Sequence, residues 1–348
     1  MKKIAVFLPV ILVLLSAGCS KFEAEQLSLK DSFDRSINNI NDAVSVISST
    51  KGYELLSSAS TEMKSDLDFR DSITLDLVAG IYDFKPNLKH HHNFFIPFRL
   101  FEKTGESDHL IVNMPEKHAF RPWCLYNPSA PDSILKNNFT IDASEYHYYY
   151  TWFNRHDYGL KADFTLDTVD IGNLEVLSES NREDGYSRSS KYTFEEGYNI
   201  AVSYETGDST ISSFNLSQDE EILMAETSIW IRDDHHKREK VYILTIGNID
   251  IIRGSKLDSI QVYLDGVLQK EAGVIITDED DDEWSVCRHR DILLTFDDGT
   301  TANLSDLIAP AKEVMATIVG SLRNMNFAKR VVDYIAISIY YHSYFINL

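Results

Sequence analysis

"LKADFTLD", residues 160–167, decides the fold, because apolar and polar residues alternate through it without a break. The apolar members of the stretch are Leu160, Ala162, Phe164 and Leu166, and the polar members are Lys161, Asp163, Thr165 and Asp167. Successive side chains of a strand point to opposite faces of its sheet. The stretch therefore predicts a β-strand with one face on a core and the other in water, as in antiparallel sheets.

The same period of two extends along most of the chain. It begins near Asp66 and continues through segments rich in Val, Ile, Thr and Tyr, at 192–204, 222–231, 241–252 and 260–276. The pairs Asp265-Gly266 and Asp298-Gly299 are typical of tight hairpin turns. Consecutive strands joined by hairpins predict an antiparallel meander rather than parallel units with crossover helices.

Both ends of the chain follow a helical period instead. An apolar stripe near the N-terminus predicts one amphipathic helix, formed by Leu29, Phe33, Ile37, Ile40, Val44 and Ile47. Ser28 and Asp31 form a capping box at its start, and Gly52 suits its end. Helical spacing also follows Pro310, whereas the last segment, "VVDYIAISIYYHSYFINL" at 331–348, fits either a strand or a buried helix.

The first twenty residues have the pattern of an export signal. Two lysines precede an apolar run of about a dozen residues, too short to span a bilayer. The run ends in Leu15, small residues and Cys19, which resembles the lipobox of bacterial lipoproteins. The resemblance implies a diacylglycerol on Cys19, cleavage before it and, because Ser20 follows, an outer-membrane location. No family resemblance extends to the mature domain.

These patterns predict a β-rich α+β fold. We expect a long antiparallel meander, as a sandwich or a curved, barrel-like sheet, with an N-terminal helix and C-terminal helices. The expected organisation is a lipoprotein signal peptide at 1–18, a tether at 19–28, an amphipathic helix at 29–60, an antiparallel β-rich domain at 61–304 and a helical segment packed on that domain at 305–348.

The net charge restricts the class of binding partner, and the cysteine content bears on disulfide formation. The formal net charge of −21 argues against nucleic acid, because phosphates would be repelled. The expected partners are a lipid bilayer, reached through the acyl anchor, and a glycan or another envelope protein. Export leaves Cys124 and Cys287 in an oxidising space, where they form either a disulfide or two separate buried thiols.

Motifs for catalysis or metal binding are not found in the sequence. The histidine tracts at 90–92 and 235–236 lack the spacing of a zinc site, and the acidic run at 278–283 lacks the order of a calcium loop. Neither a nucleophile elbow nor a phosphate-binding glycine loop occurs. We therefore expect no cofactor, no metal site and no catalytic residue that sequence can identify.

A short motif of Asp, Ser or Thr, and then an aliphatic residue or Thr recurs along the chain. It resembles the O-glycan acceptor of exported proteins in the Bacteroidetes, and ordinary strand edges are the alternative. The candidate glycosylation sites are Ser72, Ser133, Thr168, Ser209 and Ser259.

The densest aromatic cluster is "EYHYYYTWFNRHDYG", residues 145–159. In a strand its alternate residues share one face, which predicts a platform for stacking on sugar rings. The candidate ligand-binding residues are Tyr146, Tyr148, Tyr150 and Trp152, with Arg155 and His156 at the rim. Alternatively, one face of this strand belongs to the core.

Three classes of function stay open. The first is a non-catalytic envelope lipoprotein that binds a ligand or partner, with a glycan as the candidate ligand. The second is a secreted glycan hydrolase using paired carboxylates, whose separation sequence does not reveal. The third is a carrier whose curved sheet encloses a lipid. The membrane face and the oligomeric state also stay open.

Overall fold

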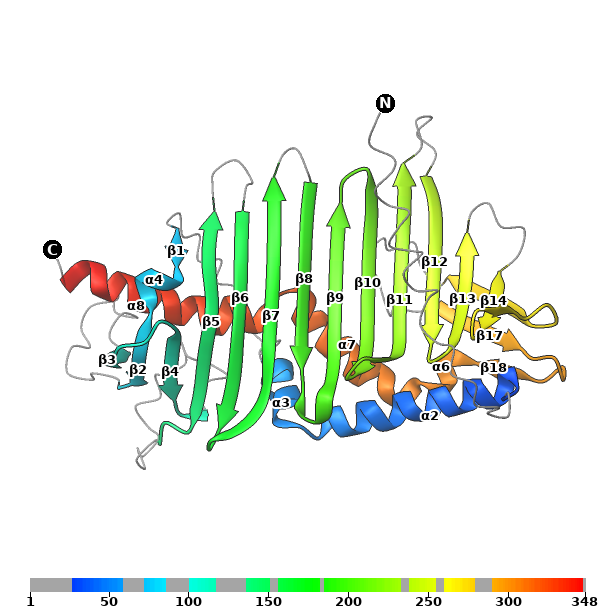
Figure 1. Cartoon of the computed structure of the whole chain (residues 1–348), viewed down its shortest axis with the longest axis horizontal. Coiled ribbons are helices and arrows are strands. Elements are labelled where there is room, and N and C mark those ends of the chain that lie inside the picture. Colours follow the sequence, from blue (N-terminus) through cyan, green and yellow to red (C-terminus); the bar gives the residue numbers. More distant parts are fainter. Residues whose placement is uncertain are drawn as a thin grey trace, which may run out of the picture.

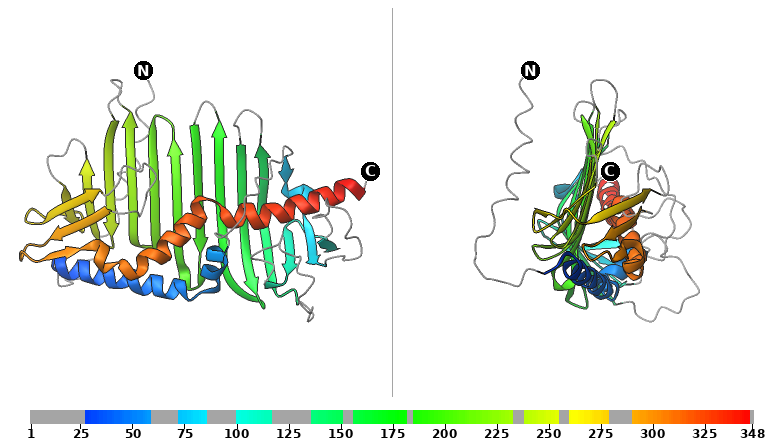
Figure 2. Two further views of the ribbon diagram at one scale, coloured as in Figure 1. Left: turned by 180° about the vertical axis from the view of Figure 1, so that it is seen from behind. Right: turned by 90° about the vertical axis from the view of Figure 1, so that its right-hand side faces the viewer.

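The computed structural model describes residues 27–58, 72–85, 100–116, 136–150, 156–181, 185–232, 238–254, 260–278 and 290–346. Most of them form one broad antiparallel sheet with helices along one of its sides (Figures 1 and 2). The predicted β-rich α+β fold with a long meander and helices at both ends is confirmed. The sheet is open, so a barrel-like closure is excluded.

The strands of the main sheet follow one another in space almost as in sequence. In chain order they are β1 (Ile73–Thr74), β2 (Gly80–Phe84), β3 (Phe101–Gly105), β4 (Leu110–Met114), β5 (Phe139–Tyr150), β6 (His156–Leu166), β7 (Val169–Asn181), β8 (Gly185–Thr193), β9 (Tyr198–Thr206), β10 (Ser209–Gln218), β11 (Glu221–Arg232), β12 (Arg238–Ile246), β13 (Ile249–Gly254), β14 (Gln261–Leu264) and β15 (Val267–Leu268). From β4 to β15 the order is uninterrupted, whereas β2 pairs in parallel with β4 and β1 pairs with β5.

A smaller antiparallel sheet lies at one end of the molecule. It consists of β16 (Gly273–Asp278), β17 (Arg290–Thr295) and β18 (Thr301–Asn303). The hairpin turns form where expected: Asp265 and Gly266 both have positive φ, at 50° and 75°, and Gly299 has a φ of 78°. Two adjacent left-handed residues suit the tight turn between β14 and β15.

The helices are α2 (Leu29–Ser48), α3 (Lys51–Ser58), α4 (Leu75–Val78), α6 (Leu304–Leu307), α7 (Ala309–Arg323) and α8 (Asp333–Ile346). The predicted capping box is confirmed, because Asp31 N donates to Ser28 Oγ at 3.1 Å. The final segment, open between strand and helix, is helical. A π-helical stretch, Ala328–Val332, leads directly into α8. No helix in the described ranges is both long enough and apolar enough to cross a membrane.

Two local predictions are wrong. Gly52 does not end the first helix, whose last residue is Ser48; it lies inside α3, where a Cβ would meet Ile171 O and Tyr192 OH at 2.8 Å each. The glycine is thus explained by close packing against the sheet. The period of two that begins near Asp66 does not give a strand at Leu75 and Leu77: one helical turn forms there instead and buries Val78, while Leu77 stays 46% exposed.

The core lies between the helices and one face of the sheet. Phe164 is central to it, with parallel rings of Phe139 and Tyr192 at 6.2 Å on either side and Phe327 edge-on at 5.1 Å. The predicted apolar stripe of α2 is buried along its length, and its Phe33 contacts Phe296 beside the small sheet. The helices cover only part of this face: in Figure 2, α7 and α8 cross it obliquely.

Candidate ligand-binding site

The face of the main sheet that packs on the helices is called the helix face, and the opposite one the open face. Along the helix face, the side chains change from apolar to polar from one end of the strands to the other. The row of cross-strand partners through Leu160, Val176, Val202 and Phe214 is still largely apolar and is buried. The next two rows differ in composition.

These two rows form the polar band. The inner row runs from β5 to β13 through Tyr148, Tyr158, Ser178, Arg188, Tyr204, Ser212, Ser228, Tyr242 and Arg253. The outer row runs from β5 to β12 through Tyr150, His156, Ser180, Tyr186, Thr206, Thr210, Trp230 and Lys240. Aromatic rings, hydroxyl groups and cations thus alternate across neighbouring strands.

At one end of the band, a histidine and two tyrosines form a chain of ring contacts. The His156 ring lies 5.6 Å from Tyr186, which lies 5.9 Å from Tyr204, each pair inclined by 51°. His156 Nε2 is 2.8 Å from Ser178 Oγ. Burial lowers the pKa of His156, and the positive charges of Lys329 and Arg188 lower it further. The histidine therefore lies in a positive local potential.

Arg188 is held in place from two sides. Its Nε donates a hydrogen bond to the Tyr186 hydroxyl, and its Nη1 donates to the carbonyl of Arg323 at the end of α7. The guanidinium also lies over the Tyr186 ring, 5.2 Å from the centroid. The carbonyl end of a helix attracts a cation, which helps to fix the side chain. Arg188 stays partly exposed despite these contacts.

The other end of the band is more open. Lys240 Nζ lies 5.6 Å from the centroid of the Trp230 ring, and the lysine is exposed. Arg253 is exposed too, whereas Tyr242, its partner in the inner row, is buried. One row beneath, Glu226 is 4% exposed. Each exposed cation therefore lies beside an aromatic ring.

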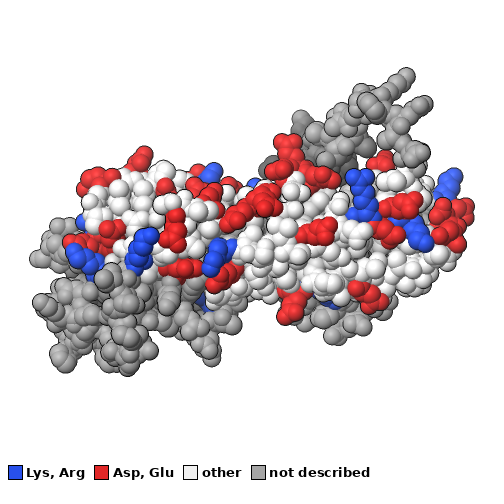
Figure 3. All heavy atoms as spheres, turned by 90° about the horizontal axis from the view of Figure 1, so that it is seen from below, with Lys and Arg blue, Asp and Glu red and all other residues white. Residues whose placement is uncertain are grey.

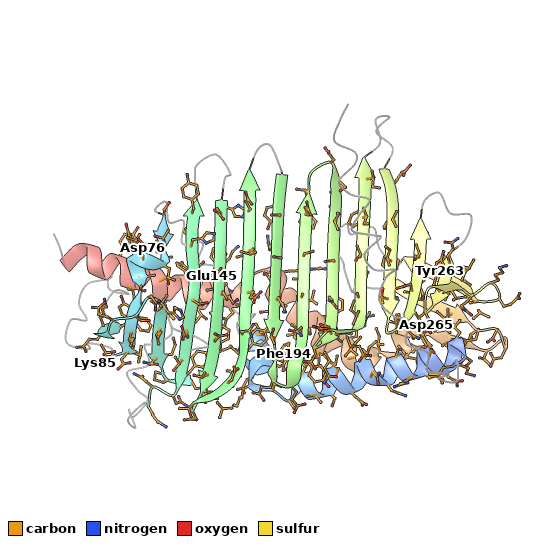
Figure 4. The ribbon with its side chains drawn as sticks, viewed as in Figure 1. Asp76, Lys85, Glu145, Phe194, Tyr263 and Asp265 are labelled. Atoms are coloured by element: carbon orange, nitrogen blue, oxygen red, sulfur yellow. The ribbon has the colours of Figure 1, made fainter. Side chains whose placement is uncertain are left out.

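The two faces of the same strands differ in charge. In β5–β13, the charged residues on the helix face whose side chains the structure describes are Arg188, Lys240 and Arg253, together with two acids, Glu226 and, beside the β10–β11 turn, Glu221. The open face carries Lys161 and Lys191 and many acids: Asp142, Glu145, Asp157, Asp163, Glu175, Glu179, Glu205, Glu239 and Asp250. Figure 4 labels Glu145 on β5. Seen from below, acidic side chains also predominate over basic ones (Figure 3).

A buried carboxyl group connects the sheet to the last helix beneath the band. Tyr146 OH and Tyr158 OH both donate to Asp333 Oδ1, at 3.1 and 3.0 Å. Burial raises the pKa of Asp333 to about 7, although the two hydrogen bonds and Lys329 act in the opposite direction. These contacts fix the start of α8 against β5 and β6.

The aromatic residues of the predicted platform occupy different environments. Tyr146 is 3% exposed and belongs to the core under α8, as the alternative of a core face implied. Tyr148 is partly buried in the inner row, and Tyr150 and His156 are partners in the outer row. Trp152 and Arg155 lie outside the described residues, so the platform as a whole stays a prediction.

The other predicted sites are only partly within the described ranges. Ser72 is exposed, Thr168 is exposed in the β6–β7 turn with a φ of 71°, and Ser209 begins β10 partly exposed. Outside those ranges lie Cys19, Cys124, Cys287, Ser133, Ser259 and the histidine tracts at 90–92 and 235–236. Among the residues whose placement is described, no group of three His, Cys, Asp or Glu could hold a metal ion.

Most residues of the polar band were missed by the sequence analysis. Arg188, Tyr204, Trp230 and Lys240 lie on four different strands, and only the register of the sheet brings them into adjacent rows. One signal was present: in "YSRSSKY", residues 186–192, both alternating sets are polar, which a strand with one core face does not require.

No family model matches the chain, and neither a curated protein nor a solved structure shows significant similarity to it.

Proposed function

We propose that this protein is a non-catalytic cell-envelope lipoprotein that binds a glycan through the polar band. The observation that carries the proposal is the pair of cross-strand rows on the helix face, in which aromatic, hydroxyl and basic side chains alternate. Flat rings stack on the apolar faces of sugars, and hydroxyl and guanidinium groups bond to sugar oxygens. Trp230, Tyr186 and Tyr204 are among the partly exposed rings of the band that suit stacking.

The anchor is the second part of the proposal. It rests on the lipobox-like residues Leu15 to Cys19, and acylation of Cys19 would leave a short tether before α2. Several acyl chains hold a protein on a bilayer stably. Cys19→Ala is expected to move the protein from the membrane fraction to the soluble fraction. A variant that stayed with the membrane would show that the anchor lies elsewhere.

The enzyme alternative receives less support. Asp142 and Asp163 are cross-strand partners on the open face, and burial together with Asp142 and Asp170 raises the pKa of Asp163. They lie side by side on neighbouring strands, whereas glycoside hydrolysis needs two carboxyl groups on either side of the scissile bond. Glycan hydrolysis by the purified protein would restore this alternative.

The carrier alternative needs an apolar space between sheet and helices. In the part that the structure describes, this space contains packed side chains, such as Phe164 in contact with Phe327. A lipid would have to displace them, at the cost of the packing that holds the helices on the sheet. A lipid that co-purifies with the protein lacking its N-terminal acyl anchor would support the carrier alternative.

The proposal is tested by glycan binding of matched aromatic variants. Trp230→Ala is expected to lower the affinity about tenfold, since stacking on an aromatic ring contributes about 1–3 kcal/mol for a nucleic-acid base and about 1.4 kcal/mol corresponds to tenfold in affinity. Tyr149→Ala is the control, because Tyr149 is a 46% exposed ring on the open face. Equal losses in both variants, or no glycan bound by the wild type, would contradict the proposal.

A further inference from the structure

We infer that the ligand of the polar band is an acidic oligosaccharide, a sugar chain that carries carboxylate or sulfate groups. The inference rests on the proposed function and adds the charge of the ligand to it. Its basis is the opposite charge of the two faces of β5–β13 and the placement of each cation beside an aromatic ring.

The positive charge of the band is local. The chain as a whole carries a formal charge of −21, but the acids of the sheet lie mainly at open-face positions. Side chains on opposite faces of a sheet point away from each other, and charges more than about 8–10 Å apart are largely screened at physiological salt. A short anionic ligand on the helix face is therefore attracted mainly by Arg188, Lys240 and Arg253.

His156 lies close to Arg188, at one end of the band. Burial is the main cause that lowers its pKa; the charges of Lys329 and Arg188 lower it further, while those of Asp157 and Glu179 raise it. The two cations that act on His156 thus come from the π-helical stretch before α8 and from β8. The two acids that act on it occupy open-face positions of β6 and β7. Its ring also contacts Tyr186, the residue that holds Arg188. An anion bound at Arg188 would raise the pKa of His156.

The spacing of the cations suits an extended ligand. Arg188 lies on β8, Lys240 on β12 and Arg253 on β13, and strands lie about 4.8 Å apart, so the two ends are roughly 20–25 Å apart. Aromatic and hydroxyl side chains occupy the strands between them. A single phosphate would engage one end only, and a nucleic acid, with a charge at every residue, would meet few cations over this length. An oligosaccharide with separated anionic groups fits both features.

Arg188 is also prepared for anion recognition. Its contacts with Tyr186 and with the Arg323 carbonyl fix the guanidinium before any ligand binds. A side chain that is already ordered loses less entropy on binding, and a guanidinium can pair with a carboxylate or sulfate through two parallel hydrogen bonds. Arg188→Lys is expected to restore little of the affinity lost in Arg188→Gln.

The experiment measures binding of paired acidic and neutralised oligosaccharides to the full mature protein in detergent. The probes are oligogalacturonate and its methyl ester, chondroitin sulfate oligosaccharide and its desulfated form, and vesicles of anionic phospholipid. At least one acidic sugar is expected to bind about tenfold or more tightly than its neutralised form, and to lose affinity with salt. NMR titration is expected to show a higher pKa of His156 in that complex.

Variants separate the outcomes. Arg188→Gln and Lys240→Gln are each expected to lower the affinity for the acidic sugar several-fold, while the open-face control Lys161→Gln leaves that affinity unchanged. If every acidic sugar binds no better than its neutral form, the inference is wrong and the proposed function stands. If no sugar binds, both fail. If the protein binds anionic vesicles but no sugar, the ligand of the polar band is a membrane surface and not a glycan.

Discussion

The helix face and the open face of β5–β13 are made by the same backbone, yet they have opposite properties. The helix face changes along the strands from the packed rings around Phe164 to the polar band, whereas the open face is polar and acidic along most of its length. Helices cover the apolar part of the helix face and leave part of the sheet uncovered (Figure 2). The packed core and the proposed binding surface thus occupy different parts of one face, while the open face is polar.

The contacts on each face explain this separation. On the helix face, Phe139, Phe164 and Tyr192 stack across three strands and are nearly inaccessible to solvent. On the open face, side-chain contacts include ion pairs such as Lys161–Glu175, whose side chains are about half exposed. Buried rings contribute several kilocalories per mole each, whereas exposed ion pairs contribute little. Substitutions on the two faces should therefore differ sharply.

The largest difference is expected between Phe164→Ala and Thr165→Ala. Phe164 is fully buried and contacts three aromatic rings, so its removal should lower the free energy of unfolding by about 3–5 kcal/mol. Thr165 is the next residue and lies on the open face, where substitution should change stability by less than about 0.5 kcal/mol. Chemical denaturation of both variants measures the difference. Similar losses would show that the open face is covered by something that stabilises it.

The second expected effect concerns the pH dependence of Asp333. Its pKa is about 7 in the folded protein and near 4 when unfolded, so the folded state binds more protons between these values. This carboxyl group therefore lowers stability as pH rises from about 4 to about 7, by up to about 4 kcal/mol. Asp333→Asn keeps an acceptor for both tyrosines and removes the ionisation. As pH rises through this range, the free energy of unfolding of the variant should therefore increase relative to that of the wild type.

Asp163→Asn is the matched control for this measurement, because burial and neighbouring carboxylates also raise the pKa of Asp163 but on the partly exposed open face. Its pH-dependent gain should be smaller. Unfolding curves at about pH 5 and about pH 8 compare the two variants with the wild type. A constant difference between wild type and Asp333→Asn would mean that Asp333 is not titrating in this range.

Two glycines give a comparison that does not depend on charge. Gly172 has a φ of 129°, and a Cβ there would meet Thr193 O at 2.4 Å, so Gly172→Ala should cost about 2 kcal/mol or more. Gly159 faces the open side, where the atoms nearest to an added Cβ belong to the His147 ring. That ring can rotate away, so Gly159→Ala should cost less than about 1 kcal/mol. Thermal and chemical unfolding check both values, and an inverted order would contradict the assignment of the faces.

Alternation of residue types predicted much of this fold. The stretch at 160–167 and the turn at Asp265-Gly266 act locally, through side-chain direction and left-handed backbone, so a single segment contains the information. Tertiary contacts overrode local patterns at Gly52, where close packing on Tyr192 requires the glycine, and at Leu77, where one helical turn replaces a strand. Closure of the sheet was also undetermined, because it depends on the pairing of the edge strands.

The candidate site was harder to predict for a related reason. Tyr148 and His156 lie close together in sequence and were identified from one aromatic cluster. Trp230 and Lys240 come from strands more than seventy residues further on and join the same rows only through the register of intervening strands. The burial of single side chains could not be predicted from the sequence either. Tyr146 resembles its neighbours in sequence, but it lies in the core, where its hydroxyl group donates a hydrogen bond to Asp333. Register and helix docking thus decide which polar residues form one surface.

The smallest expected effect is on the open face itself, at the Lys161–Glu175 pair. The two charges are 3.7 Å apart and about half exposed, so the pair contributes at most a few tenths of a kcal/mol. Removing either charge should nevertheless change the stability in opposite directions. Lys161→Gln removes a cation from a face crowded with acids and should destabilise slightly, whereas Glu175→Gln lowers the negative charge of a chain at −21 and should be neutral or slightly stabilising.

Salt distinguishes this account from simple loss of an ion pair. If repulsion among the acids of the open face matters more than the pair, added salt should stabilise the wild type and narrow the gap between the two variants, because screening weakens exposed charges. If the pair dominated, both variants would lose stability by the same amount and salt would weaken the wild type. Denaturation at low and high ionic strength measures which applies. The first result would mean that the open face tolerates its acids at a cost, and that its charge serves solubility rather than folding.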